Sequence, residues 1–172
     1  MRVILAEKPS VAQSIAAVLG ADQKKNGYLQ GENDLVSWCI GHLIELAPPE
    51  IYDARYAKWR REDLPIVPSA WESVVSDGTK KQFAVLKDLL NRTDVDEVVC
   101  ATDAGREGEL IFRMVYEKTG CTKPVKRLWI SSLEESAIRE GFRSLKPGTA
   151  YDALYCAALC RAQADWLVGI NG

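Results

Sequence analysis

This 172-residue sequence predicts an α/β fold, in which a mostly parallel sheet is flanked by helices. Short apolar runs rich in β-branched residues alternate along the chain with segments whose apolar residues recur at helical spacing. Strands that alternate with helices form βαβ units, and such units build parallel sheets. Acidic side chains directly follow two of the apolar runs, and open α/β sheets bind their ligands at the carboxyl ends of their strands.

The first elements follow from local signals. The run Arg2–Ala6 is short, apolar and β-branched, which indicates a buried strand. A helix follows, because Pro9 is tolerated in a first helical turn and Gly20 is a natural stop after the last apolar position. Two further runs flank a turn at residues 31–34 and predict a hairpin. Its strands are Tyr28–Gln30 and residues 35–40.

Between residues 47 and 76 the periodic pattern is absent and prolines are frequent. A long irregular excursion within a compact domain is usually functional or packed like an Ω-loop. We expect Trp59 and Trp71 to anchor it by packing. An alternative assigns Trp59, together with Arg60 and Arg61, to base stacking and phosphate contacts.

Regular structure returns after the excursion and continues to the end of the chain. The predicted elements are helices at 79–91, 106–119, 132–142 and 149–168 and strands at 95–101 and 124–130. Ser132, three residues before Glu135, has the pattern of a capping box. The composition becomes nearly apolar after residue 147, so we place a domain boundary there, with an α/β domain at 1–147 and the first helix of a following helical domain at 148–172. We expect the chain to be the N-terminal part of a longer protein, because little follows that helix for it to pack on.

Composition excludes several classes of protein. The 22 Lys and Arg residues against 24 Asp and Glu give a formal net charge of −2, and 47% of the residues are hydrophobic, which argues against disorder. A pI of about 5.5 argues against bulk electrostatic binding of nucleic acid but leaves room for a local basic groove. No apolar run approaches the roughly 20 residues of a membrane span, and the N-terminus lacks the pattern of a signal peptide, so we expect a cytoplasmic protein without membrane contact.

The five cysteines support neither a disulfide framework nor a zinc site. Their number is odd, their spacing is wide, and no CxxC pair occurs. Cys156 and Cys160 share a helix face by their spacing, and we expect them to pack there like other small apolar residues.

Acidic residues at two strand ends are the main chemical signal. Glu7 follows the first strand, and Asp103 and Glu107 follow the strand at 95–101. If the two strands are neighbours, these carboxylates converge, and such a group suits Mg²⁺, which prefers oxygen ligands and substrate phosphates. The N-terminus of the helix near Arg106 would favour a phosphate at the same place. Crowded like charges also raise the pKa of at least one carboxyl, which can then act as a general acid at neutral pH.

These acids also have ordinary interpretations. Acidic residues are common in the first turn of a helix because they complement the helix dipole, and single acids at strand ends are often solvated. Glu109 and Arg113 have the spacing of a simple helical ion pair.

Five blocks of the sequence, in order and spread over nearly the whole chain, resemble the Toprim domain of type IA DNA topoisomerases, and the topoisomerase III branch fits best. The blocks are AEKPS at 6–10, GHL at 41–43, ATDAGREGELI at 101–111, KRLWISS at 126–132 and RAQADWLVG at 161–169.

The resemblance implies a Toprim fold, related to Rossmann-like folds, and a specific activity. Type IA topoisomerases cut one DNA strand by attack of a tyrosine, hold a 5′-phosphotyrosine link, pass another strand and reseal the break without ATP. By this resemblance Glu7 is the general acid and base at the 3′ oxygen, and Lys8 stabilises the charge of the phosphate. Asp103 and Glu107, with Glu7 beside them, would hold Mg²⁺.

The sequence departs from the family pattern in two ways. The usual motif is Asp-x-Asp-x-Glu, and Gly105 replaces the middle acid here, so we expect one Mg²⁺ rather than two. The nucleophilic tyrosine of the family lies downstream, in a domain absent from this chain. We interpret the six tyrosines present as structural and expect the chain alone to be inactive.

Single-stranded DNA and the downstream domains of the same chain are the expected partners, at a nucleoid-associated location. The resemblance places His42, Arg127, Arg161 and Asp165 at the DNA, with Arg127 as a phosphate contact and Asp165 orienting Arg161. The ordinary alternatives are a structural histidine, a solvated basic tract around residues 117–146, and an ion pair between Arg161 and Asp165 at helical spacing.

Two other functions remain open at this stage. A similar cluster of metal-binding acidic residues also occurs in other metal-dependent phosphotransfer enzymes, such as nucleases and primases. A non-catalytic nucleotide- or partner-binding module that lost its chemistry at Gly105 is the second alternative, although no GxxxxGK[ST] loop supports nucleotide binding.

Overall fold

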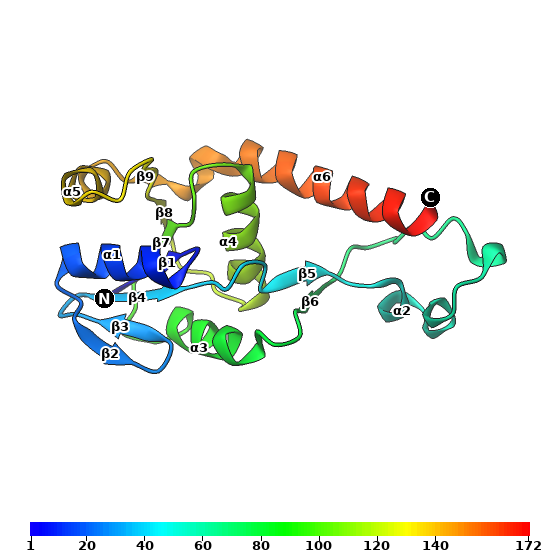
Figure 1. Cartoon of the computed structure of the whole chain (residues 1–172), viewed down its shortest axis with the longest axis horizontal. Helices are drawn as coiled ribbons and strands as arrows, with labels where there is room; N and C mark the ends of the chain where they lie inside the picture. Colours follow the sequence, from blue (N-terminus) through cyan, green and yellow to red (C-terminus); the bar gives the residue numbers. More distant parts are fainter.

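The computed structural model describes residues 1–172 and shows a seven-stranded sheet flanked by helices (Figure 1). The strand order is β2-β3-β4-β1-β7-β8-β9, and β4, β1, β7 and β8 run parallel to one another. The strands are β1 (Arg2–Ala6), β2 (Gln23–Lys25), β3 (Tyr28–Gln30), β4 (Asp34–Trp38), β7 (Glu97–Ala101), β8 (Val125–Arg127) and β9 (Lys146–Pro147). The α/β prediction is confirmed.

Helices cover both faces of the sheet. They are α1 (Pro9–Leu19), α3 (Lys80–Leu90), α4 (Arg106–Lys118), α5 (Glu135–Arg143) and α6 (Asp152–Asn171). Alternate residues of β1 point to opposite faces, so that Ile4 packs with α1 and α5 while Val3 and Leu5 pack with α3 and α4. The apolar, β-branched run predicted as a buried strand is therefore buried on both sides.

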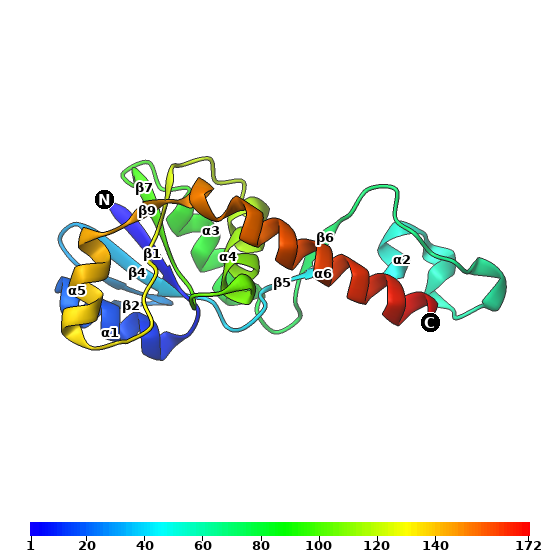
Figure 2. The same ribbon diagram turned by 90° about the horizontal axis from the view of Figure 1, so that it is seen from above.

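A second, two-stranded sheet leads into an extended arm. β5 (Ile44–Leu46) pairs with β6 (Ser73–Val75), and residues 48–72 between them hold the short helix α2 (Pro49–Tyr52) and single turns at Ala54–Ala57 and Arg61–Asp63. This segment, called the arm here, extends away from the main sheet beside the C-terminal end of α6 (Figure 2). The irregular excursion is thus confirmed, with a strand at each end.

One of the two predicted aromatic anchors of the arm is confirmed. Trp71 packs edge-on against Trp166 of α6, with ring centroids 5.3 Å apart. The expectation that Trp59 is packed is wrong, since its side chain is 68% exposed. The expectation of packing is also wrong for Cys156 and Cys160, which are both exposed on α6, whereas Cys39, Cys100 and Cys121 are buried.

Several element ends differ from the sequence-based expectation. α5 begins at Glu135, after Glu134 as its cap residue, and no side-chain bond caps it, so the capping box at Ser132 is wrong. The Ser132 hydroxyl instead accepts a hydrogen bond from the backbone N–H of Glu134 at 3.2 Å. The expected stop at Gly20 is confirmed, because this residue takes a left-handed conformation with φ +72°.

The C-terminal segment packs on the α/β body. A short turn at Gly148–Tyr151 leads into α6, which lies along α4 and reaches the arm. The domain boundary after residue 147 stays a prediction. None of the helices combines the length and the apolar character that a bilayer crossing requires.

Candidate active site

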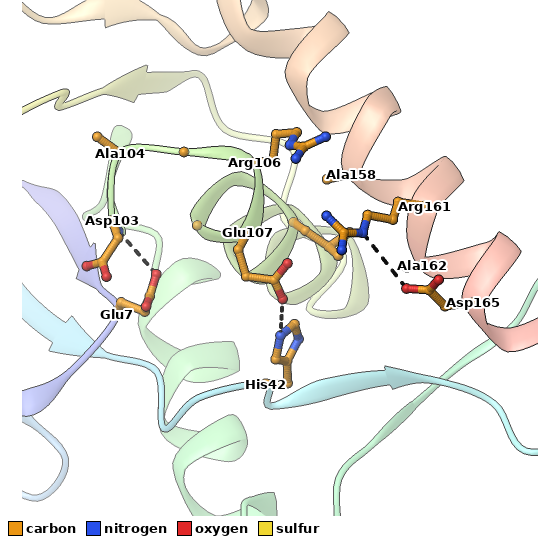
Figure 3. Close-up of a pocket in the computed structure, with 13 residues that line it drawn as sticks. Glu7, His42, Asp103, Ala104, Arg106, Glu107, Ala158, Arg161, Ala162 and Asp165 are labelled. Carbon is orange, nitrogen blue, oxygen red and sulfur yellow. Dashed lines mark hydrogen bonds and ion pairs between the residues drawn. The ribbon is translucent and has the colours of Figure 1, made fainter. Parts of the chain in front are cut away.

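The registers of β1 and β7 bring two acidic residues together. Ala6 lies opposite Ala101, so both strands end at the same level and their next residues leave the sheet at one edge. Glu7 Oε1 accepts a hydrogen bond from the backbone N–H of Asp103 at 3.2 Å (Figure 3). Two chain segments almost a hundred residues apart therefore meet where the sequence predicted.

The protonation of Glu7 is altered by this neighbourhood. Burial raises the pKa of the Glu7 carboxyl above its ordinary value, and the negative charge of Asp103 raises it further. The hydrogen bond from the Asp103 N–H and the charge of Lys8 act in the opposite direction and are weaker. A carboxyl with a raised pKa can donate a proton closer to neutral pH, as a general acid must.

A tight turn carries Asp103 into α4. The Thr102 hydroxyl donates to the carbonyl oxygen of Gly108 at 2.7 Å, and a Cβ added at Gly108 would lie 1.9 Å from the carbonyl oxygen of Asp103. Gly105 has φ +157°, a backbone conformation that L side chains rarely adopt. The glycines at 105 and 108 therefore both suit this turn, the first by its backbone conformation and the second by its close contact with Asp103.

Glu107 points toward His42 rather than toward the other two acids (Figure 3). The two side chains form an ion pair if the histidine is protonated, and both are substantially exposed. His42 lies in the loop between β4 and β5, where the Ser76 hydroxyl donates to its carbonyl oxygen at 2.9 Å. The site thus contains two separate pairs, and no three His, Cys, Asp or Glu side chains of the chain lie close enough together to form a ready metal site.

These residues line one cavity of about 690 Å³ between the sheet edge and α6. Glu7, Asp103 and Glu107 line it from the body, and Arg161 and Asp165 line it from α6. Arg161 Nε lies 4.0 Å from Asp165 Oδ2, and both side chains are exposed, so this ion pair is weak and leaves the guanidinium accessible.

Arg106 and Lys8 occupy different positions relative to this cavity. Arg106, the first residue of α4, lines it, although sequence reasoning used this residue only to mark the start of a helix. Its place between Asp103 and Glu107 was the available signal. Lys8 precedes α1 and is not part of the lining, but its charge reaches Glu7.

The structure corrects the expectation for Arg127. Its side chain is 1% exposed, and its Nε lies 2.6 Å from Oε1 of Glu109, which is 2% exposed. The guanidinium is therefore not accessible to a DNA phosphate. The helical pair of Glu109 with Arg113 is confirmed, with 3.3 Å between Oε2 and Nε.

None of the six tyrosines lines the cavity. Tyr116 donates to the carbonyl oxygen of Lys123, and burial raises the pKa of Tyr155 to about 12, which disfavours a phenolate nucleophile there. The structural interpretation of the tyrosines agrees with these contacts.

The acidic side chains of the cavity have the chemistry that a hard divalent cation requires, although no three of them converge in the structure. The hard oxygen ligands available are carboxylates, and the crowding that raises the pKa of Glu7 would be relieved by a positive ion between it and Asp103. Glu107 and Asp165 line the same cavity, but Glu107 pairs with His42 and Asp165 with Arg161.

The sequence matches the family model of the Toprim domain over residues 2–133. It is 56% identical over 171 residues to DNA topoisomerase 3 of Shouchella clausii, covering 99% of this chain and 24% of that protein. Identity is 53% over 169 residues with DNA topoisomerase 3 of Bacillus thuringiensis (strain Al Hakam), covering 98% of this chain and 23% of that protein. With DNA topoisomerase 3 of Staphylococcus epidermidis it is 52% over 169 residues, with coverages of 98% and 24%.

Among solved structures, full-length topoisomerase I from Thermotoga maritima superposes with a TM-score of 0.65 at 23% identity, covering 96% of this chain and 24% of that one. This likeness concerns the fold. The chain spans about a quarter of the length of the relatives that it matches. On the match over residues 2–133, the chain belongs to the Toprim domain family.

Proposed function

We propose that this chain is the N-terminal Toprim part of a type IA DNA topoisomerase of the topoisomerase III branch. The whole enzyme would cleave one DNA strand, pass another through the gap and reseal the break without ATP. The observation that carries this proposal is the contact of Glu7 with the Asp103 backbone at 3.2 Å, inside a cavity that Glu107, His42 and Arg161 also line. The 52–56% identity to topoisomerase 3 proteins supports it.

Glu7 carries out the proton transfers of the proposed reaction. The phenolate of a tyrosine from the downstream part of the protein attacks the scissile phosphorus, a bond from its oxygen to phosphorus forms, and the bond to the 3′ oxygen breaks. Glu7 gives its proton to that oxygen, and in resealing it takes the proton back as the 3′ hydroxyl attacks the phosphotyrosine. The raised pKa of Glu7 suits this exchange, because the protonated form persists to higher pH.

Basic side chains around the acids would hold the DNA backbone. Arg161 and Arg106 line the cavity and can donate two parallel hydrogen bonds to a phosphate. Lys8 lies beside Glu7 in the chain and adds positive charge there. His42, paired with Glu107, offers a donor from the opposite loop.

Glu7, Asp103 and Glu107 would hold the divalent cation, which we propose is Mg²⁺. When bound, it supplies positive charge beside the phosphate and so favours alignment of the cut ends. Calorimetric titration of this chain with Mg²⁺ tests the site, with Asp103→Ala and Glu107→Ala expected to weaken binding. Equal and negligible binding in all three proteins would contradict the metal site and favour an inert binding module.

A single-stranded DNA substrate would place the enzyme with the nucleoid in the bacterial cytoplasm.

The decisive experiment is supercoil relaxation by the longer protein that contains this chain. Glu7→Gln is expected to reduce relaxation by a factor of about 100 or more, within the range lost when an acid–base group is removed. Glu32→Gln is the matched control, because Glu32 lies in the turn before β4, at the opposite edge of the sheet.

Full relaxation by Glu7→Gln would remove Glu7 from the chemistry. Nicked DNA that the wild-type protein never reseals would instead indicate a nuclease.

A further inference from the structure

The buried ion pair of Arg127 and Glu109 lies directly behind the turn that carries Asp103. Arg127 is the last residue of β8, and its guanidinium donates to the carbonyl oxygen of Thr102 at 2.6 Å and to that of Asp103 at 2.8 Å. These two carbonyl groups lie beyond the end of β7, where strand pairing no longer provides hydrogen-bond partners. The side chain of Arg127 thus donates to the main chain of the two residues that follow β7, as a neighbouring strand would do within the sheet.

Glu109 fixes the orientation of this guanidinium. Glu109 Oε1 lies 2.6 Å from Arg127 Nε, and both side chains are at most 2% exposed. A buried charge without a partner is strongly destabilising, so each residue requires the other. Because a buried ion pair is often no more stabilising than well-packed apolar side chains, stability alone does not account for it. Its geometry, with both Nη atoms on carbonyl groups of the Asp103 segment, points to a positioning role.

The network continues to the opposite wall of the cavity. Oε2 of Glu109 lies 3.3 Å from Nε of Arg113, whose Nη1 donates to Asp152 Oδ1 at 2.6 Å. Nη2 of Arg113 donates to the carbonyl oxygen of Gly148 at 2.8 Å. Asp152 begins α6, the helix that brings Arg161 to the cavity. One chain of contacts therefore joins the acidic turn to the helix that faces it.

We infer that Arg127 and Glu109 are positioning residues for the acidic site, which hold the Thr102–Asp103 main chain in place for its contact with Glu7 and tie it to α6 through Arg113. This inference rests on the proposed function for its consequence in cation binding. Neither residue lines the cavity, so neither acts on the substrate directly.

Two measurements on this chain test the inference. Arg127→Lys keeps the charge, but the three N–H donors of an ammonium radiate from one nitrogen and cannot reproduce the planar fork whose separate nitrogens reach Glu109 and the two carbonyl groups. We expect the Asp103 amide, which donates to Glu7, to exchange its hydrogen about tenfold faster, while the amides of β1 and β7 keep their protection. We also expect Mg²⁺ affinity by calorimetry to fall by about 10- to 100-fold, the usual effect of removing support behind a metal ligand.

Glu109→Gln is the second variant, since the amide keeps the shape and an acceptor oxygen but removes the negative charge that holds the guanidinium of Arg127. It should change both readouts in the same direction. Arg139→Lys is the matched control, because Arg139 pairs with Glu135 on the exposed surface of α5 and should change neither.

The possible outcomes separate this inference from the proposed function. If the wild-type chain binds no Mg²⁺, the metal site fails, and the exchange rate of the Asp103 amide still decides the inference. Unchanged exchange at Asp103 in both variants overturns the positioning role. Loss of the fold in both variants also overturns it, because the pair would then be a requirement of the core rather than of the turn.

Discussion

Asp103 affects Glu7 in two opposing ways. Its carboxylate repels the charge of Glu7, whereas its backbone N–H donates a hydrogen bond to the Glu7 carboxylate. Burial and repulsion together exceed the hydrogen bond, so the net effect is a raised pKa. A site of this kind holds two like charges together without a cation, but at a cost in stability that depends on pH.

The sign of that pH dependence follows from linkage. Because the pKa of Glu7 is raised in the folded protein, the unfolded chain releases its proton first as pH rises. The folded state therefore loses stability as pH rises through the interval between the unfolded and the folded pKa. We expect Glu7→Gln, which cannot ionise but keeps an acceptor for the Asp103 N–H, to raise Tm at pH 7.

This gain in Tm should disappear as pH falls below the ordinary glutamate pKa of about 4.5, where both states are protonated in the wild-type chain. Thermal unfolding followed by circular dichroism over a pH series measures it, with Glu32→Gln as the exposed control. A lower Tm for Glu7→Gln at pH 7 would contradict the raised pKa.

Gly105 gives a second prediction at a single residue. Its φ of +157° is unfavourable for any L side chain, although a Cβ there would meet no atom within 4 Å. Both Gly105→Ala and Gly105→Asp should therefore lose about 1–3 kcal/mol of unfolding free energy from backbone strain. Without Mg²⁺ the aspartate should lose more than the alanine, because it adds a third negative charge beside Glu7 and Asp103.

Urea denaturation with and without Mg²⁺ separates strain from charge in these two variants. If the aspartate joins the cation site, added Mg²⁺ should stabilise Gly105→Asp more than Gly105→Ala. Wild-type stability in both variants would show that the backbone at residue 105 relaxes easily.

At the scale of elements, the arm depends on the last turns of α6. Trp166 donates from Nε1 to the carbonyl oxygen of Ala47 at 3.0 Å and packs against Trp71. Asn171 exchanges two hydrogen bonds with the backbone of Ile66, at 2.6 and 2.9 Å. The arm has little other regular structure, so these contacts set its orientation.

Trp166→Ala should therefore loosen the arm without unfolding the sheet. We expect the free energy of local opening in residues 48–72 to fall by about 0.5–3 kcal/mol, the common range for single substitutions. Hydrogen exchange resolved by mass spectrometry measures this change. Val168→Ala is the control, because Val168 is 72% exposed on the same helix. Equal exchange of the arm in the wild-type protein and in Trp166→Ala would contradict the dependence on α6.

The elements that could be predicted from the sequence are those whose residues are buried in the main sheet or against it, because burial produces a recognisable apolar pattern. The strand Arg2–Ala6 was predicted in full, because four of its five residues are buried. β2 was missed because all three of its residues are exposed and polar. The β5–β6 pair was missed because its paired residues lie 27 to 31 positions apart in the sequence and meet only through the fold.

The same limit applies to the site. The meeting of Glu7 and Asp103 was predictable, because parallel neighbouring strands share a carboxyl edge. The burial of Arg127 was not, because an arginine at the end of a strand has the same local pattern whether it faces solvent or a buried Glu109. The partner of a buried charge is set by packing between elements, which a single sequence does not display.

At the scale of the whole molecule, the proposed function requires an acidic chain to take part in binding a polyanion. The net charge of −2 gives no general attraction, so DNA affinity would depend on a few basic residues around the cavity. Arg161 is one of them, since its ion pair with Asp165 is long and exposed and its side chain lines the cavity from α6.

Arg161→Ala in the longer protein should weaken single-stranded DNA binding and reduce the slope of log K against log salt by about 0.7, the value for one phosphate contact on a single strand. Fluorescence anisotropy with a labelled oligonucleotide over a salt series measures that slope. Arg139→Ala is the matched control, because Arg139 already pairs with Glu135 on the surface of α5, and its slope should equal that of the wild-type protein. A wild-type slope for Arg161→Ala as well would assign Arg161 to its ion pair with Asp165 and would leave Arg106 as the arginine of the cavity able to contact the phosphate.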